Sequence, residues 1–531
     1  MKNKGLLLIL IIGISIRVII SFSNEYAINH GISSDDSYYY YRIAQNISNG
    51  FGSTFDQINF TNGYQPLVLL FLVLIFSFFD KDLLLPVVIS QIIFSLISTI
   101  AAYFTFVLVR KLTNKTFPAL LSTFLLFLNP VIIAFNFKAL ETNFYWLFLI
   151  LTVLFYSKFV HNQNNLSYRF LFGILIAISA LSRLDGAFYI VAFVIYLIFS
   201  FRMNLLMRIK SVVASGLGFC VLFIPYLVYN FLTFDHVIPI SGRAKVFHNH
   251  KLVLSQVGDY WTLDFILYEL KRFFYPFNFD LFANRGFGLF EQIFAYVIFI
   301  LLLIGFIYFI KKKYFIRTLN YFKGYGFLIL FLFIHYSYYT LYFWEYRFYY
   351  YFPEIITLIV LFSISLNEII TDKINSKRIY SIIYNVKFIF AVFTVLFVIG
   401  GYKIFTANHE QILPLKTSKW IKQNIPENKI LASANAGILS YYSQRKIINL
   451  DGMVNNDELL NAYKEGELAF LKYLKEKNIE YIVDYFLSPE PENKYQFPQV
   501  LNDKYQVIHI VTDPRLKYQK LNHMLVIKLN L

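Results

Sequence analysis

Two adjacent carboxylates near the start of this chain, Asp35 and Asp36, are the side chains best suited to chemistry. They follow the first hydrophobic segment and precede a run of tyrosines at 38–41. Like charges side by side near a low-dielectric region push one carboxyl pKa upward, which suits a general base acting on an acceptor hydroxyl or amine. Solvation of a loop, or capping of a helix expected to begin near Tyr38, are the alternative roles.

Other polar residues lie in later breaks between hydrophobic segments. Tyr64 and Gln65 belong to a short motif at 60–67. Glu141 opens a hydrophobic segment, where an acid also suits the positive end of a helix dipole. Arg183 and Asp185 interrupt an otherwise apolar stretch, and they form either a structural ion pair in a tight turn or part of a polar cavity.

Three cations complete the candidate set, namely Arg243, Lys245 and Arg347. Arginine binds phosphate oxygens through two parallel hydrogen bonds and lysine acts as a point charge, so these residues could hold a phosphate or pyrophosphate. Anchoring to lipid headgroups is the alternative. A divalent cation held by Asp35, Asp36 and Glu141 is also conceivable, since hard cations prefer carboxylate ligands.

The composition indicates what must position these residues. Of the 531 residues, 57% are hydrophobic and only 15% are charged, which is typical of a polytopic α-helical membrane protein. The net charge of +16 resides mainly in short loops, which favours a role in membrane topology over nucleic-acid binding. We predict about eleven spans. Their ranges are 5–22, 85–109, 117–135, 142–160, 170–182, 186–201, 211–232, 289–310, 325–343, 350–366 and 386–404.

The distribution of Lys and Arg predicts the orientation of these spans. Basic residues collect in alternate loops, and the positive-inside rule then places those loops and the amino terminus in the cytoplasm. Residues 66–79 are apolar but too short to cross, so we expect a helix at the outer interface within a large first outer loop, 23–84. All the polar clusters described above then fall on the extracytoplasmic side.

From about residue 405 the chain changes character. Pro, Asn, Lys and Glu become more frequent, and strand-like runs alternate with helical ones, for example 429–432, 446–450 and 481–484 around a helical stretch at 457–477. This pattern is typical of a small α/β domain. The predicted fold class is therefore an all-α polytopic membrane domain, 1–404, followed by an extracytoplasmic α/β domain, 405–531.

Several short motifs, in this order, resemble the GT-C superfamily of integral-membrane glycosyltransferases, which includes protein O-mannosyltransferases, aminoarabinose transferases and oligosaccharyltransferase catalytic subunits. The resemblance covers nearly the whole chain. The motifs that carry it are Asp35-Asp36 with Ile43-Ala44, the segment 61–67, Asn129-Pro130 with 140–142, the segment 182–186, and the tail stretches 434–437 and 449–452.

The resemblance implies an inverting transferase of a prokaryotic cell membrane that uses a sugar on a polyprenyl phosphate or diphosphate. Its acceptor would be a lipid, a glycan or a protein. Asp36, aligned through Ile43-Ala44, would be the base in preference to Asp35, and basic residues would hold the leaving phosphate. One departure concerns Gln65-Pro66, where several branches carry Lys-Pro-Pro or His-Pro-Pro, so a phosphate contact there is in doubt.

Two other classes of function compete with this interpretation. A lipid or sugar transporter, or a flippase of the cell-envelope glycan pathway, should carry ionisable residues near mid-bilayer and matching halves. Here the polar clusters gather at one surface instead. A scaffolding membrane protein whose tail binds partners would leave the clustered charges without a role. The sequence therefore favours the enzyme.

Overall fold

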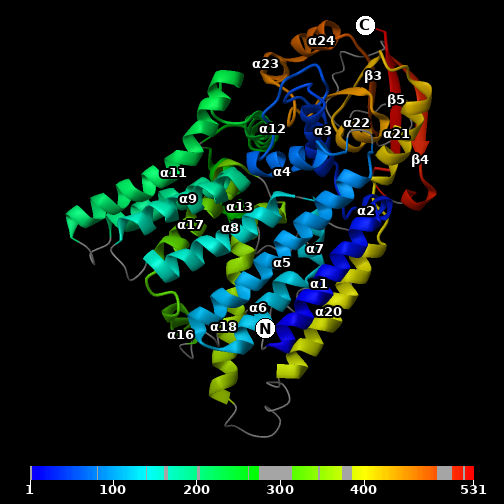
Figure 1. Cartoon of the computed structure of the whole chain (residues 1–531). Coiled ribbons are helices and arrows are strands. Elements are labelled where there is room, and N and C mark those ends of the chain that lie inside the picture. The colour runs from blue at the N-terminus through cyan, green and yellow to red at the C-terminus, as the bar shows by residue number, and fades with distance from the viewer. Residues whose placement is uncertain are drawn as a thin grey trace.

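The computed structural model describes residues 3–79, 82–138, 140–160, 165–199, 204–260, 262–273, 314–344, 347–373, 386–486, 505–517, 519 and 521–530. Helices form a long bundle, and a small sheet lies at one end of it (Figure 1). The chain enters at the opposite end of the bundle, where α1 (Lys4–Phe22) begins. Helix α20 (Val386–Thr406) leads into the sheet-containing part.

Six described helical segments are long and apolar enough to cross a membrane. They comprise α1, α5 (Leu85–Thr113), α8 (Glu141–Phe155) with the π turn that follows, α11 (Leu205–Phe234), α18 (Phe352–Lys373) with the 3-10 turn before it, and α20. Their length and apolar composition indicate a multi-pass membrane protein, as the composition predicts.

The prediction of about eleven spans is not confirmed. The expected span 117–135 is divided into α6 (Thr116–Phe127) and α7 (Pro130–Lys138), which are bent by 52°. Pro130 has no backbone N–H to continue the ladder of α6, and this explains the break. The expected span 289–310 lies outside the described residues.

Shorter apolar helices occupy the other expected spans. Segments 170–182, 186–201 and 325–343 correspond to α9 (Leu166–Ser182), α10 (Phe188–Ile198) and α17 (Gly326–Ser337), each below the usual length of a span. Helix α9 stops where Arg183 adopts an extended conformation. The charged break at 183–185 therefore shortens both neighbours.

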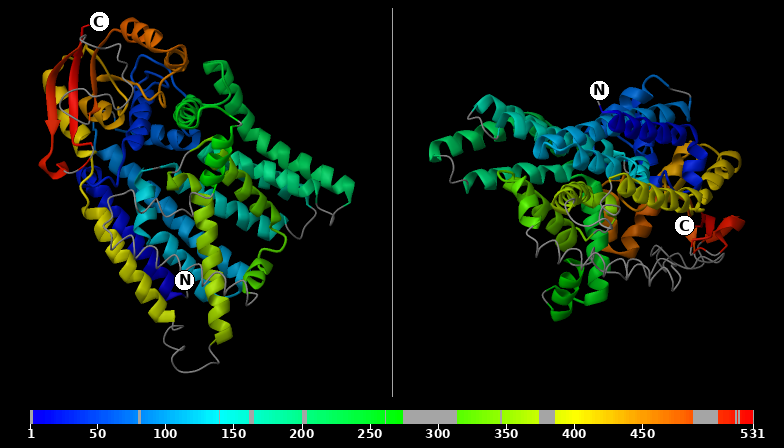
Figure 2. Two further views of the ribbon diagram at one scale, coloured as in Figure 1. Left: turned by 180° about the vertical axis from the view of Figure 1, so that it is seen from behind. Right: turned by 90° about the horizontal axis from the view of Figure 1, so that it is seen from below.

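Helices α9 and α11 pack with their backbones nearly touching. A Cβ at Gly173 would lie 2.0 Å from the carbonyl oxygen of Ser215, and a Cβ at Gly218 would lie 2.0 Å from that of Phe170. Small residues permit such close approach between membrane helices, where dispersion rather than water exclusion drives packing. This pair extends sideways from the bundle in the view from below (Figure 2).

The first connection carries three helices and lies at the end of the bundle near the sheet. These are α2 (Asn24–Asn29), the amphipathic α3 (Asp35–Ser48) and α4 (Pro66–Phe76). Helix α4 has 11 residues, so it is too short to span a bilayer, in keeping with the interface helix expected at 66–79. Pro66 sits at its first turn, where the missing N–H costs no hydrogen bond.

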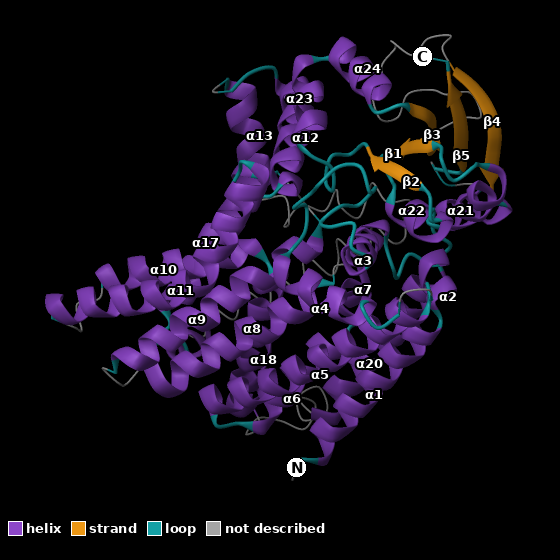
Figure 3. Cartoon of the chain, turned by 45° about the horizontal axis from the view of Figure 1, so that its top comes forward, coloured by secondary structure: helices purple, strands orange, loops and turns teal. Residues whose placement is uncertain are grey.

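The carboxy-terminal part is built around a five-stranded mixed sheet of order β2-β1-β3-β5-β4 (Figure 3). Strand β1 (Ile430–Ser433) pairs in parallel with β2 (Lys446–Asn449) and β3 (Ile479–Phe486), whereas β5 (His523–Leu529) is antiparallel to β3 and to β4 (Tyr505–Thr512). The expected strands thus appear near their expected positions.

Helices connect and cover these strands. They are α21 (Ile412–Asn424), α22 (Gly437–Ser443), α23 (Asp457–Glu465) and α24 (Glu467–Glu476). The single helix expected over 457–477 is two, because Gly466 adopts φ +105°, a conformation open mainly to glycine.

The hydrophobic core continues from the membrane part into the sheet-containing part. One buried cluster joins Tyr38 and Tyr41 of α3 and Leu72 of α4 to Leu439 of α22 and Val483 of β3. The first connection is therefore held between the bundle and the sheet, and its helix α3 has a fixed orientation toward both.

Candidate active site

Helix α3 directs its two adjacent carboxylates to different places. The helix begins at Asp35, so both acids lie in its first turn, near the positive end of its dipole. Successive side chains on a helix point about 100° apart. Asp35 is buried against α22, whereas Asp36 is partly exposed and lines a large cavity.

Asp35 fixes α3 to the carboxy-terminal part. Its Oδ2 accepts a hydrogen bond from the backbone N–H of Gly437 at 3.0 Å, and its Oδ1 accepts one from Ile438 at 2.8 Å. Burial raises the pKa of the Asp35 carboxyl to about 7, although these two amides favour the charged form. Asp35 thus acts as a hydrogen-bonded latch between segments 402 positions apart.

Asp36 is paired with a cation that also lines the cavity, Arg347. Nη1 of Arg347 donates to its Oδ2 at 2.9 Å, and the hydroxyl of Tyr349 lies 3.4 Å from the same oxygen. Arg347 also donates to the Tyr349 hydroxyl at 2.9 Å. The side chains of Asp36 and Arg347 are each nearly half exposed, so a ligand can reach both groups.

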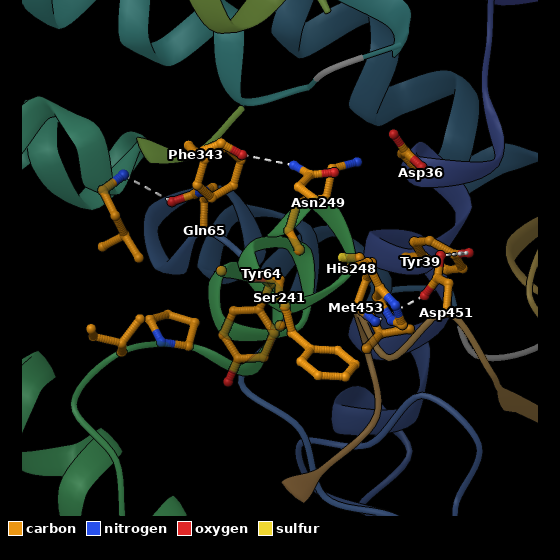
Figure 4. A pocket seen from close by; sticks show the side chains of 18 of the residues that line it. Asp36, Tyr39, Tyr64, Gln65, Ser241, His248, Asn249, Phe343, Asp451 and Met453 are labelled. Carbon is orange, nitrogen blue, oxygen red and sulfur yellow. Dashed lines mark hydrogen bonds between the residues drawn. The ribbon is translucent and has the colours of Figure 1, made fainter. Parts of the chain in front are cut away.

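The cavity has a volume of about 1160 Å³ and lies between α3, α12 (Ile240–Val257), the segment before α18 and the loops after β1 and β2. Figure 4 shows Asp36 to one side of it and Gln65, His248 and Asp451 around it. Its ionisable lining residues include Asp36, Lys138, Glu141, Arg183, Asp185, Lys245, His248, Lys251, Arg347, Asp451 and Glu467. A space of this size accommodates a substrate much larger than one sugar.

Arg183 is held by several partners at once. Its Nε donates to Oδ2 of Asp185 at 2.8 Å, and its Nη1 lies 3.5 Å from Oε1 of Glu141. Its other donors reach the backbone oxygen of Tyr349 and the hydroxyl of Tyr339, each at 3.3 Å. Only 3% of its side chain is exposed, and its donors are used by these partners, so Arg183 stabilises the cavity lining.

A buried histidine extends this network below the cavity. Nε2 of His335 lies 3.2 Å from Oδ2 of Asp185, and its Nδ1 lies 2.8 Å from Oε1 of Glu354. Together with His335 of α17, Arg183, Asp185 and Glu141 thus form one ionic cluster that links α8, the turn after α9 and α17. The sequence left open whether Arg183 and Asp185 form a structural ion pair or part of a polar cavity. The structure shows both, since the two paired residues also line the cavity.

Tyr64 and Gln65 line the cavity and also hold their own loop. Oε1 of Gln65 accepts from the backbone N–H of Leu184 at 3.0 Å, and its backbone N–H donates to the Tyr40 hydroxyl at 3.1 Å. The hydroxyl of Tyr64 lies 2.8 Å from that of Ser53. Gln65 therefore ties the first connection to the turn that carries Arg183.

The two candidate cations of α12 have different environments. Lys245 lines the cavity, but Arg243 is not among the cavity-lining residues. Arg243 pairs with Asp457, to which its Nη2 donates at 2.9 Å, and it thereby ties α12 to α23. Its role in the structure is to anchor the wall that carries Lys245.

The three carboxylates considered for a divalent cation are not brought together. Asp36 and Glu141 face the cavity, but Asp35 is turned toward α22. Within the described residues, no three His, Cys, Asp or Glu side chains are grouped as metal ligands.

Sequence reasoning did not select Asp451 and His248, which lie together in the cavity (Figure 4). Oδ1 of Asp451 accepts from the backbone N–H of Met453 at 2.8 Å, and its Oδ2 accepts from the Tyr39 hydroxyl at 3.3 Å. Burial raises the pKa of the Asp451 carboxyl to about 6. The only signal was the tail stretch 449–452, which the sequence analysis matched to a family without assigning it a role.

Comparisons with known proteins agree with this architecture. Residues 64–229 match the family model described as dolichyl-phosphate-mannose-protein mannosyltransferase, and residues 403–523 match a domain of unknown function, DUF8728. No protein in the curated set of sequences matches the chain.

Among solved structures, the chain resembles the oligosaccharyltransferase of Archaeoglobus fulgidus in the apo form. The identity is 14% over 91% of this chain and 70% of that one, with a TM-score of 0.54. The same archaeal enzyme, AglB, in complex with an inhibitory peptide and a dolichol-phosphate gives a TM-score of 0.55 at 13% identity over the same shares. ArnT from Cupriavidus metallidurans in the apo state gives 0.51 at 12% identity, over 97% of this chain and 98% of that one.

The chain has the GT-C fold. The resemblance inferred from the sequence motifs is therefore confirmed at the level of fold. Within the GT-C fold, Asp36 occupies the first connection, the cavity lies at the end of the bundle that carries the sheet, and the tail domain supplies part of the cavity wall.

Proposed function

We propose that this GT-C protein is a membrane glycosyltransferase that moves a sugar from a polyprenyl-phosphate-type donor to an acceptor on the extracytoplasmic face. The observation that supports this most strongly is the pair formed by Asp36 and Arg347 at 2.9 Å, both reachable from a cavity of about 1160 Å³. One group is a base and the other is a phosphate ligand, and the two lie within the span of one glycosyl phosphate.

The reaction needs one proton acceptor and one anion ligand. Asp36 takes the proton of the acceptor hydroxyl while the acceptor oxygen attacks the anomeric carbon of the donor. The bond between that carbon and the phosphate oxygen breaks, and its electron pair leaves on the phosphate. Arg347, helped by Lys138 and Lys245 of the cavity lining, stabilises the added negative charge. Attack from the face opposite the leaving group inverts the anomeric configuration.

The remaining candidate residues have supporting roles in this proposal. Arg183, Asp185 and Glu141 hold the cavity floor, while Tyr64 and Gln65 shape the side near the bundle. Arg243 contributes through α12, as the anchor of the wall that carries Lys245. Apolar lining residues between α10 and α12 suit the first isoprene units of a lipid carrier. These are Phe188, Phe223, Leu227, Val237 and Ile238.

The proposal includes a membrane orientation and a division of the chain. Residues 1–404 form the transferase domain in the cell membrane with the amino terminus in the cytoplasm, and 405–531 form an extracytoplasmic domain. The cavity and the amino terminus lie at opposite ends of the bundle, which supports this orientation.

The test is turnover with the purified full-length protein and a panel of polyprenyl-phosphate and polyprenyl-diphosphate sugars. Release of the lipid phosphate together with transfer of the sugar to an added acceptor is the expected result. Movement of an intact lipid-linked sugar across a vesicle, without cleavage of any donor in the panel, would replace the transferase with a flippase.

A further inference from the structure

One part of the cavity is lined by residues of the carboxy-terminal domain, among them Asp451 and Tyr463. Tyr39 follows Asp36 by three positions, so both side chains lie on one face of α3, about one helical turn of 5 Å apart. The Tyr39 hydroxyl lies 3.0 Å from the backbone oxygen of Ala434 and 3.3 Å from Oδ2 of Asp451, and these two acceptors share its single proton. Asp451 and the candidate base line the same cavity, and burial together with the charge of Asp36 raises the pKa of Asp451.

This region also lies where a parallel sheet normally binds ligands. The cavity lining includes Ala434 and Asn435, which directly follow β1, and Leu450 and Asp451, which directly follow β2. Strands β1 and β2 are parallel neighbours. In open sheets of this kind the crevice at the carboxyl ends of the strands is the usual ligand site.

The polar groups at this position can accept and donate hydrogen bonds to hydroxyl groups. The Asp451 carboxylate has about four acceptor positions, of which the Met453 amide, the Tyr39 hydroxyl and the Asn449 side chain use three. The neighbouring His248 lines the cavity and forms a hydrogen bond with the backbone of Asp451, while its buried Nε2 has no partner at hydrogen-bond geometry within the described residues. A buried polar atom without a partner costs free energy, and a ligand hydroxyl would remove that cost.

Aromatic rings form the adjoining wall. Tyr463 of α23 packs in a stacked pair with Phe470 of α24, with ring centroids 5.1 Å apart, and both line the cavity. The edge of His248 meets the Tyr463 ring, with centroids 5.3 Å apart. A wall of flat apolar rings beside hydrogen-bonding groups matches the two faces of a pyranose, which is apolar across the ring and polar at its rim.

We propose that Asp451, His248 and Tyr463 form an acceptor subsite for a carbohydrate. This inference rests on the proposed transferase function and adds the chemical class of its acceptor. A carbohydrate fits better than a peptide because the wall combines aromatic rings with hydrogen-bonding groups. None of the residues lining the described part of the cavity belongs to a strand that could receive a peptide by strand addition, one of the recurring modes of peptide binding.

Direct binding tests this proposal without any donor. Short neutral oligosaccharides of hexoses and N-acetylhexosamines, and peptides of similar length, are titrated into the purified full-length protein while saturation-transfer NMR monitors binding. Asp451→Asn and His248→Gln keep side-chain size and should each weaken oligosaccharide binding about tenfold to a hundredfold. Glu458→Gln is the matched control, because Glu458 pairs with Lys477 on the same domain and does not line the cavity.

The outcomes separate this inference from the transferase proposal. Oligosaccharide binding that depends on Asp451 and His248 supports the subsite even if no donor in the panel is cleaved. Binding of peptides in preference to oligosaccharides, or oligosaccharide binding unaffected in both variants, overturns it. If Asp451→Asn does not fold, His248→Gln alone decides. In turnover, the KM for a carbohydrate acceptor should rise in both variants while the KM for the donor does not.

Discussion

The residue that carries most of the proposed chemistry is Asp36. Its neighbour Asp35 has both carboxylate oxygens committed to the backbone of α22, which leaves Asp36 as the member of the pair that faces the cavity. Asp36→Asn keeps the shape and removes the base, so turnover should fall about 10²–10⁴-fold with donor binding retained. Initial rates and donor titration measure the two effects. Full activity of Asp36→Asn would remove the main support for the reaction.

Asp35 gives a prediction about stability at different pH values. Its pKa in the folded protein is about 7, above the ordinary value of 3.8, so the folded state holds this proton more tightly than the unfolded state. The stability that the Asp35 carboxyl contributes is fully present below its ordinary pKa of 3.8. It is lost as the pH rises through the folded-state pKa of about 7. The thermal midpoint in detergent should therefore decrease from about pH 5 to about pH 8.

Substitution isolates the contribution of Asp35 from that of other groups. Asp35→Asn should make the midpoint less dependent on pH over this range, because the amide does not titrate. Asp259→Asn, which removes an exposed carboxylate from a distant loop, is the control and should leave the dependence as it is. An unchanged dependence in Asp35→Asn would mean that other groups, such as Asp451, cause it.

Arg347 is the cation in direct contact with the candidate base. A charge-assisted hydrogen bond to phosphate contributes about 1.5–3 kcal/mol, so Arg347→Ala should lower kcat/KM for the donor about tenfold to a hundredfold. Lys517→Ala, which removes an exposed lysine that does not line the cavity, serves as the charge-matched control. Donor kinetics that do not change would reduce Arg347 to a lipid anchor.

At the scale of secondary structure, the contact between α3 and α22 positions the site. A Cβ added at Gly437 would lie 2.2 Å from the backbone oxygen of Asp35, so this contact tolerates only glycine. Gly437→Ala should separate the helices, lower the thermal midpoint and reduce turnover. Gly216→Ala is the control, since no atom lies within 4 Å of a Cβ on that exposed part of α11. Equal stability of the two variants would show that α3 does not depend on the latch.

The elements also explain how far the sequence could be interpreted. Six of the eleven spans predicted from long apolar runs coincide with helices long enough to cross a membrane, and the strand-like runs near residues 430, 447 and 482 are strands, because both patterns are local. The bend between α6 and α7 and the division of α23 from α24 depend on single residues, Pro130 and Gly466, within otherwise continuous patterns.

The candidate site was partly predictable for a similar reason. Asp36, Glu141 and Lys245 are charges in breaks between apolar segments, and such charges are visible in a sequence. Which member of the acidic pair faces the cavity depends on the backbone of Gly437, far along the chain. Asp451 and His248 lie among other polar residues in the sequence, so the sequence does not distinguish them from their neighbours. Only tertiary packing identifies them as cavity-lining residues.

At the scale of the whole molecule, the cavity and the amino terminus lie at opposite ends of the bundle. The proposed orientation predicts that cysteines introduced at Leu468 and at Lys111 react with a membrane-impermeant reagent from opposite sides. Leu468→Cys should label in intact cells and Lys111→Cys only after lysis, both in a Cys220→Ser background. Labelling of both positions in intact cells would contradict the orientation.

The latch between Asp35 and Gly437 has a consequence for the time at which the candidate site becomes complete. Its two halves are separated by 402 positions, so α3 cannot take its final place until the tail domain has been synthesised. At about 5–20 residues per second, the first connection waits roughly 20–80 s after its own translation. Its buried carboxylate and tyrosines remain without their partners during that interval. A chain interrupted before the tail would therefore carry Asp36 without the contact that positions α3, and under the proposed function such an unfinished protein would consume no lipid-linked sugar.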